Sequence, residues 1–255
     1  MGLVLTRATV AHAADVRVAV AANFTAVLER LAGDFERDTH HHVTVVSGAT
    51  GTLYAQVTHG APFDVFLAAD EQTPARLEAE GLAVAGTRFT YAIGQLALSS
   101  ATPGLVDGRG DVLRRGAFRH LAVANAKLAP YGAAALEVID AMGLGDELRP
   151  KLVVGENVGQ VAQLVASGSA EVGFVALSQV LTPGGVSPGS FWVVPQRLYT
   201  PIRQQAVVLS RGAANPAARA LVDYLKDARV KSVIVSFGYT AGESAAPPPA
   251  PPPSP

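Results

Sequence analysis

Residues 15–50 read DVRVAVAANFTAVLERLAGDFERDTHHHVTVVSGAT, and this stretch decides the fold class. Its first apolar run, VRVAVAA, is rich in β-branched residues and is typical of a buried strand. In the segment that follows, Leu28, Leu31 and Phe35 recur at helical spacing, and HVTVVSG then predicts a second strand. A strand, a helix and a strand in this order indicate a βαβ unit, in which the two strands are parallel.

The same alternation continues to the C-terminal part of the chain. Further strands are predicted at 63–69, 90–100, 118–125, 151–156, 170–177 and 203–210. Further helices are predicted at 51–60, 71–81, 128–143, 157–168, 215–227 and 228–238. The fold class is therefore α/β with mainly parallel sheets. Periodicity alone leaves open whether the strands form one wide sheet or two lobes with chain crossings near 90–96 and 198–206.

Composition limits what the protein can be. The chain has 255 residues, of which 49% are hydrophobic and 16% charged, so it can form a sizeable core. Its net charge of −1 argues against a nucleic-acid binder, which usually carries a basic surface. There is no cysteine, which excludes thiol catalysis, disulfides, cysteine-held metals and a lipid-modified cysteine. No apolar run reaches the roughly 18 residues of a membrane span.

The two ends differ from the middle. Residues 1–14, MGLVLTRATVAHAA, place Ala11 and Ala13 in an A-x-A arrangement, which is typical of an export signal and indicates a periplasmic protein; a non-native leader is the alternative. Residues 244–255 are proline-rich and predict an extended, disordered tail. The folded unit is then expected to span about 15–243.

Common motifs of phosphate and metal binding are missing. The sequence contains no phosphate-binding P-loop and no zinc-protease motif. The histidines at 40–42 lie between a helix and a strand, where neighbouring side chains diverge, so a solvated turn is expected in place of a metal site. His59 and His120 have no acidic or histidine partner at a ligand spacing. We expect no enzymatic activity, no cofactor and no directly bound cation.

Four strand-to-helix junctions share a feature that points to an anion. Each helix start leaves backbone N–H groups without internal partners and carries a partial positive charge. In an open α/β sheet such ends gather at one edge, where ligands bind. Asn and Thr are also ordinary helix caps, so one junction alone indicates nothing. The only basic residue close to any junction is Lys127. The four junctions are Ala22-Asn23, Ala49-Thr50, Pro130-Tyr131 and Asn157-Val158.

Several segments, in the same order, resemble one family. The segment GAPFDVFLAAD (60–70) is especially diagnostic in combination with the others. Together they are similar to the periplasmic molybdate-binding proteins of ABC transporters. The segments are AVAANF (19–24), GATGTLYAQVTHGAPFDVFLAAD (48–70), KLAPYGAAA (127–135) and GENVGQ (155–160).

The resemblance implies a two-lobed type II periplasmic binding protein fold, whose lobes are mainly parallel sheets flanked by helices and joined by a hinge of two crossing strands. The expected domains are a discontinuous lobe 1 (15–92 plus 204–243) and a lobe 2 (93–203). Molybdate or tungstate would lie between the lobes and pass to the membrane permease of an ABC importer. A monomer is expected.

The family's ligand contacts fall on Ala22, Asn23, Thr50, Tyr131 and Val158. Asn23 would give its side-chain amide, Thr50 its hydroxyl and N–H, and Tyr131 and Val158 their backbone N–H groups. Some members use a tyrosine hydroxyl from the strand in which this chain has Ala176, so the number of donors stays open.

Three other functions remain as alternatives. A general, sulfate-type oxyanion receptor has the same donors but no preference for the larger ions. An enzyme on the same fold requires a base and a nucleophile in the cleft, and no such pair is visible. An intracellular sensor domain disagrees with an export signal.

Overall fold

The computed structural model describes residues 13–182, 185–186 and 188–240. The predicted export signal at 1–14 lies almost entirely outside the described residues, and the proline-rich tail lies wholly outside them. Within the described part, no helix is long and apolar enough to span a membrane.

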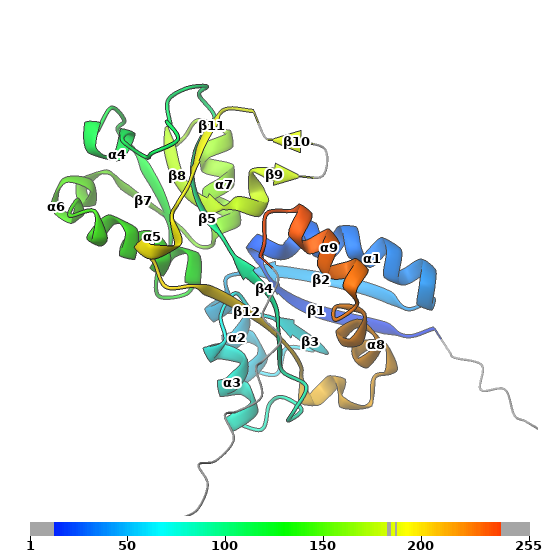
Figure 1. The fold of residues 1–255 in the computed structure, drawn as a ribbon. Helices are drawn as coiled ribbons and strands as arrows, with labels where there is room; N and C mark the ends of the chain where they lie inside the picture. The colour runs from blue at the N-terminus through cyan, green and yellow to red at the C-terminus, as the bar shows by residue number, and fades with distance from the viewer. Residues whose placement is uncertain (1–12, 183–184, 187, 241–255) are drawn as a thin grey trace, which may run out of the picture.

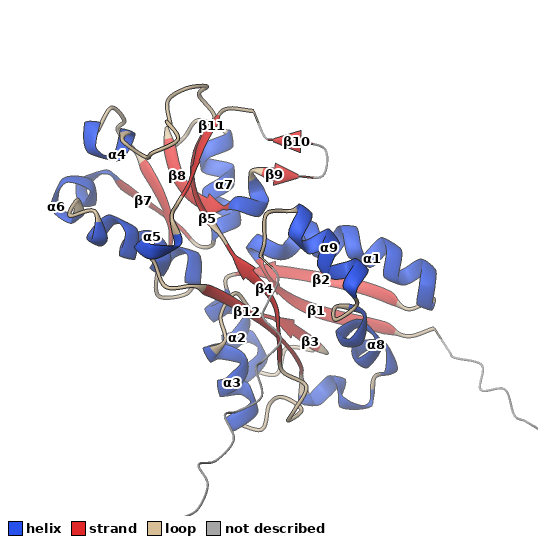
Figure 2. Cartoon of the chain, in the orientation of Figure 1, coloured by secondary structure: helices blue, strands red, loops and turns tan. Residues whose placement is uncertain are grey.

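The chain forms two five-stranded sheets, each flanked by helices (Figures 1 and 2). The first sheet has the order β2-β1-β3-β12-β4 and the second β11-β5-β8-β6-β7. In each sheet four strands run in one direction and one, β12 or β5, runs against them. The two-lobed α/β architecture and the mainly parallel sheets are thus confirmed.

Lobe 1 is named here for the first sheet and its helices. Its strands are β1 (Asp15–Ala21), β2 (His42–Gly48), β3 (Val65–Leu67), β4 (Phe89–Gly94) and β12 (Ile202–Val208). Its helices are α1 (Thr25–Thr39), α2 (Thr50–Thr58), α3 (Gln72–Ala79), α8 (Pro216–Tyr224) and α9 (Ala228–Ser236), with the 3₁₀ turns η1 (Ala22–Phe24) and η5 (Ser210–Ala214).

Lobe 2 is named for the second sheet and its helices. Its strands are β5 (Leu96–Ser100), β6 (Leu121–Ala124), β7 (Leu152–Gly155), β8 (Val172–Ala176) and β11 (Ser190–Val193), beside a small ladder of β9 (Leu181–Thr182) and β10 (Gly185–Val186). Its helices are α4 (Val112–Arg115), α5 (Pro130–Ala141), α6 (Gly145–Leu148) and α7 (Val158–Ala166), with 3₁₀ turns η2 (Arg149–Lys151), η3 (Leu177–Gln179) and η4 (Gln196–Leu198).

Alternation along the strands of lobe 1 produces two apolar layers. Val16, Val18 and Val20 of β1 pack into a cluster with α1, α8 and α9. Ala19, from the opposite face of the same strand, packs with α2 and α3. Successive side chains of a strand point to opposite faces, so helices can cover both sides of the sheet.

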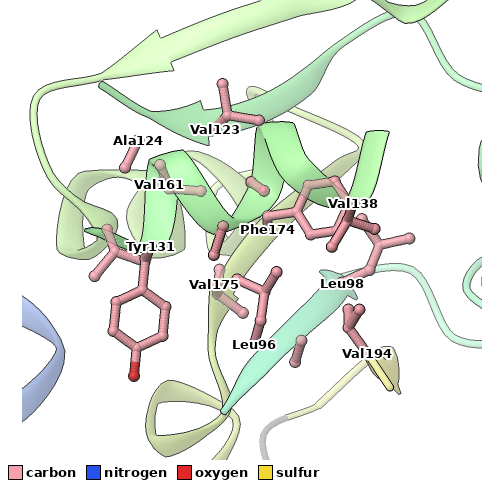
Figure 3. Packing of buried hydrophobic residues seen from close by; sticks show 14 of the residues in the cluster. Leu96, Leu98, Val123, Ala124, Tyr131, Val138, Val161, Phe174, Val175 and Val194 are labelled. Atoms are coloured by element: carbon pink, nitrogen blue, oxygen red, sulfur yellow. The ribbon is translucent and has the colours of Figure 1, made fainter. Parts of the chain in front are cut away.

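A third cluster fills lobe 2 and includes Tyr131. Figure 3 shows Tyr131 at the edge of this cluster, with its hydroxyl pointing away from the labelled apolar side chains. The ring is therefore packed as an apolar body, and its polar end is available to residues outside the cluster.

The predicted single strand at 90–100 is wrong in one respect. The chain forms two strands there, β4 and β5, which belong to different sheets and are separated by Gln95. At Gly94 a Cβ would collide with the Tyr131 hydroxyl, so the crossing passes too close to lobe 2 for a side chain. The chain returns between Val193 and Ile202. Strand β11 and the short helices α4 and α6 were not predicted either.

The start of α5 is fixed by a close approach to β6. A Cβ on Gly132 would collide with the carbonyl oxygen of Ala124 at the end of that strand. We therefore expect Gly132→Ala to lower the free energy of unfolding by about 1–3 kcal/mol, the usual cost of overpacking. Chemical denaturation measures the change. Gly33→Ala is the control, because a Cβ there meets nothing within 4 Å; equal stability of the two variants would contradict the prediction.

Candidate functional site

All five sequence-predicted site residues line one small cavity between the lobes. Its wall also contains Asn157 and the last residues of β1 and β2, Ala21 and Gly48. The cavity has a volume of about 10 Å³, far below the roughly 300–1,000 Å³ of sites for drug-sized ligands. The lining residues are Ala21, Ala22, Asn23, Gly48, Ala49, Thr50, Ala69, Ala129, Pro130, Tyr131, Asn157 and Val158.

None of these lining residues carries a charge. Lys127, the one basic residue that the sequence places near a junction, is exposed and lines a neighbouring, larger hollow instead. That hollow also contains Asp70, Glu71, Glu137 and Arg203. The small cavity is thus a neutral environment, in which hydrogen bonds are the available means of holding an ion.

Helix starts supply the donors. Pro130 is the first residue of α5 and has no N–H, so Tyr131 carries the first backbone donor of that helix. In α7 the Asn157 side chain accepts a hydrogen bond of 3.0 Å from the N–H of Gln160, which leaves the Val158 N–H without a cap. Asn157 therefore acts as an ordinary helix cap, one of the roles open to an asparagine at such a junction.

Thr50 has its oxygen occupied and its hydrogen available. The backbone N–H of Ala69 donates to Thr50 Oγ1 at 3.0 Å, and the residue is buried. A hydroxyl that accepts this bond still has one hydrogen to donate. This arrangement suits the donor role expected for Thr50.

Asn23 is placed differently from the expectation. Its side-chain nitrogen donates inside the protein, to Gln204 Oε1 at 2.8 Å and to the Tyr239 hydroxyl at 2.9 Å. Its Oδ1 is buried and is the one buried side-chain polar atom without a partner among the described residues. In this orientation both amide hydrogens of Asn23 are used before any ligand is considered.

The lobes touch on two sides of the cavity. The N–H of Gly51 in lobe 1 donates to the carbonyl of Leu128 in lobe 2 at 2.9 Å. A Cβ on Gly51 would lie 3.1 Å from Cα of Leu128, and one on Gly159 would lie 3.4 Å from Cβ of Ala22. These contacts bring the donors of the two lobes to opposite walls of one cavity.

Residues that sequence reasoning missed lie behind Asn23. Gln204 of strand β12 is fully buried, and Tyr91 and Tyr239 are buried with it. The polar run Arg203-Gln204-Gln205 inside a predicted strand was the signal that could have revealed them. Ala176 is buried and does not line the cavity.

The histidines lie away from the cavity. His40 ends α1 in a left-handed conformation and His42 contacts Glu36, but His41 is buried and accepts a hydrogen bond from the N–H of Ala14. The predicted solvated turn is therefore wrong for His41. Among the described residues, no three His, Asp or Glu side chains are grouped as metal ligands.

Comparison with known proteins identifies the family of this chain and two similar proteins. The family model for bacterial extracellular solute-binding proteins matches residues 16–240. The chain is 56% identical over 232 residues to the molybdate-binding protein ModA of Azotobacter vinelandii, covering 91% of this chain and 92% of that protein. It is 46% identical over 239 residues to ModA of Rhodobacter capsulatus, covering 94% and 93%.

A solved structure is similar as well. The periplasmic molybdate-binding protein of Azotobacter vinelandii superposes with a TM-score of 0.87 at 42% sequence identity, covering 89% of this chain and all of that one.

The contribution of the Asn157 cap to the free energy of unfolding can be measured. Asn157→Ala removes the acceptor of the Gln160 N–H, so we expect the free energy of unfolding to fall by about 1 kcal/mol. Asn157→Asp keeps an acceptor oxygen and serves as the control, with a change of a few tenths of a kcal/mol. Denaturation curves of the two variants test this; an alanine variant as stable as the aspartate variant would refute the capping role.

Proposed function

The chain belongs to the bacterial extracellular solute-binding protein family, and on that basis we propose that it captures molybdate in the cavity between its lobes. It is a molybdate-binding periplasmic protein of an ABC transporter, and it hands the ion to the membrane permease of that importer. The single observation that supports the site is the convergence of Ala22, Asn23, Thr50, Tyr131 and Val158 on one uncharged cavity.

The donors come from both lobes. Ala22, Asn23 and Thr50 belong to lobe 1, whereas Tyr131 and Val158 start helices of lobe 2. Only a closed arrangement of the lobes lets all of them reach the same ion, so binding favours closure. The chain crossings at Gln95 and between Val193 and Ile202 are the two hinge segments of this motion.

Hydrogen bonds to the ion can supply the free energy that its binding requires. A hydrogen bond to a charged group contributes about 1.5–3 kcal/mol. Five or six of them total about 7.5–18 kcal/mol, which reaches the roughly 8 kcal/mol of micromolar binding before ordering costs are subtracted. No ion-paired lysine or arginine is required.

In the bound state that we propose, the ion meets hydrogen-bond donors, and such a wall selects against protonated anions. Hydrogen phosphate carries a proton that needs an acceptor, and the donor-lined wall offers few. Molybdate and tungstate are fully ionised and nearly equal in size, whereas sulfate is smaller. The protein therefore takes up both larger ions. The relatives are named as binding proteins, in agreement with a role without catalysis.

Ligand stabilisation tests this selectivity. We expect molybdate and tungstate to raise the melting temperature, because an ion that binds only the folded state stabilises it by mass action. At 100 times the dissociation constant the gain is about 2.7 kcal/mol. Sulfate and phosphate at the same concentrations serve as controls and are expected to have little effect. Equal stabilisation by sulfate would establish the alternative, a general oxyanion receptor.

The Thr50 hydroxyl is tested by a substitution that keeps its shape. Thr50→Val removes the donor, so we expect calorimetry to show molybdate affinity lowered by about 1–3 kcal/mol, or roughly 5- to 150-fold. Thr52→Val is the matched control, because Thr52 is exposed two residues further along the same helix. If both variants bind as tightly as the parent protein, Thr50 does not hold the ion.

A further inference from the structure

A buried polar cluster, here called the amide cluster, connects Asn23 to the hinge. Gln204 lies at its centre on β12, the strand through which the chain re-enters lobe 1. All its members are buried, and they come from both lobes and from the segment after α9. The members are Asn23, Tyr91, Tyr131, Ser178, Gln204 and Tyr239.

One atom of the cluster is unsatisfied. Gln204 Oε1 accepts from Asn23 Nδ2 at 2.8 Å and from the Tyr91 hydroxyl at 2.9 Å, and Gln204 Nε2 donates to the Tyr131 hydroxyl at 3.2 Å. Asn23 Oδ1 alone has no partner. A buried acceptor left unpaired costs about 1–3 kcal/mol.

That orientation also opposes the bound ion. The Asn23 nitrogen faces Gln204 and Tyr239, so the amide presents its oxygen to the remaining side, where Asn23 forms part of the cavity wall. A carbonyl oxygen repels a doubly negative ion. The cavity therefore gains a donor only if the Asn23 amide turns over.

A joint half-turn of the two amides keeps the partners satisfied. Gln204 Nε2 then donates to Asn23 Oδ1 and to the Tyr91 hydroxyl, which itself donates to the carbonyl of Ala68 at 3.1 Å. Gln204 Oε1 accepts from the Tyr131 hydroxyl. Asn23 Oδ1 accepts from the Tyr239 hydroxyl, and Ser178 Oγ still donates to the Asn23 carbonyl at 3.0 Å. Asn23 Nδ2 is released toward the cavity.

The hydroxyls of the cluster stay protonated in both arrangements. Burial raises the pKa of Tyr91, Tyr131 and Tyr239 above the usual range of a phenol. Each hydroxyl therefore has one hydrogen to give and can reverse its direction without a change of charge. The joint half-turn of the two amides therefore requires no ionisation of a tyrosine at neutral pH.

We propose that Gln204 is a positioning residue of the oxyanion site, which sets the end of the Asn23 amide that faces the ion. Binding of the anion turns both amides together and replaces an orphaned acceptor by a donor. The same glutamine contacts the hydroxyl of Tyr131, whose backbone N–H holds the ion from lobe 2, so the hinge strand connects donors of both lobes. This inference rests on the proposed function.

Nuclear magnetic resonance of the full chain detects the turn directly. Before molybdate is added, the side-chain amide protons of Gln204 are expected to show nuclear Overhauser contacts to the ring of Tyr131. After saturation these contacts are expected to move to the ring of Tyr91 and the amide of Asn23. Calorimetry on the same sample reports binding separately.

The two measurements separate the positioning role of Gln204 from the proposed binding of molybdate. Molybdate bound with the Gln204 protons still beside Tyr131 overturns the positioning role and leaves the proposed function intact. Absence of molybdate binding overturns the proposed function, and the inference falls with it.

Substitutions provide a second test. Gln204→Met keeps the length of the side chain and removes its hydrogen bonds, so we expect molybdate affinity to fall at least tenfold. Gln205→Met is the matched control, because Gln205 contacts Arg88 and Thr90 outside the amide cluster, and it is expected to bind normally.

The combined variant separates positioning from a general structural role. Asn23→Ala is made in the parent protein and in the Gln204→Met variant, and the loss of molybdate affinity is measured in each. If Gln204 acts through Asn23, we expect the loss in the Gln204→Met variant to be at least five times smaller than the loss in the parent protein. Full additivity of the two effects would overturn the positioning role.

Discussion

Backbone N–H groups at the start of a helix have no partner within that helix, and residues from several helix starts of this chain line one cavity. Each site residue follows the end of a strand, so the sheet edge fixes where its helix begins. The donors are part of the main chain or are held by it, as Thr50 is by the N–H of Ala69. Apart from the Asn23 amide, which we propose turns when the ion binds, donors of this kind are in place before an ion arrives, and little side-chain entropy is lost on binding.

The sequence predicts the elements and the junctions well because both depend on local patterns. Alternating apolar residues in β1 identify a buried strand, and Pro130 identifies a helix start, whatever the rest of the chain does. The five site residues came from matching segments to a family, and the structure brings all five to one cavity. The meeting of separate junctions follows from parallel strands, whose carboxyl ends share an edge.

Other features depend on contacts between distant residues and leave no local pattern. The strand predicted at 90–100 divides at Gln95 because its halves pair with different sheets, a tertiary choice that alternation cannot record. The orientation of the Asn23 amide is set by Gln204 and Tyr239, which lie 181 and 216 residues further along the chain. His41 is buried because Ala14 and Phe35 pack against it. Side-chain direction is the part of a site that spacing predicts least.

The size of the cavity follows from the main chain more than from side chains. Gly51 and Gly159 let the lobes approach closely: a Cβ on Gly51 would lie 3.1 Å from Cα of Leu128, and one on Gly159 would lie 3.4 Å from Cβ of Ala22 in η1. Because Leu128 is approached through its main chain as well as its side chain, and Ala22 has no rotatable side chain, the closed distance between the lobes has little room to adjust to a smaller ion. An ion that is too small then loses hydrogen bonds on one wall, each worth about 1.5–3 kcal/mol to a charged guest. On the proposed function, selectivity among dianions of equal charge would therefore follow from this spacing, with no charged residue required.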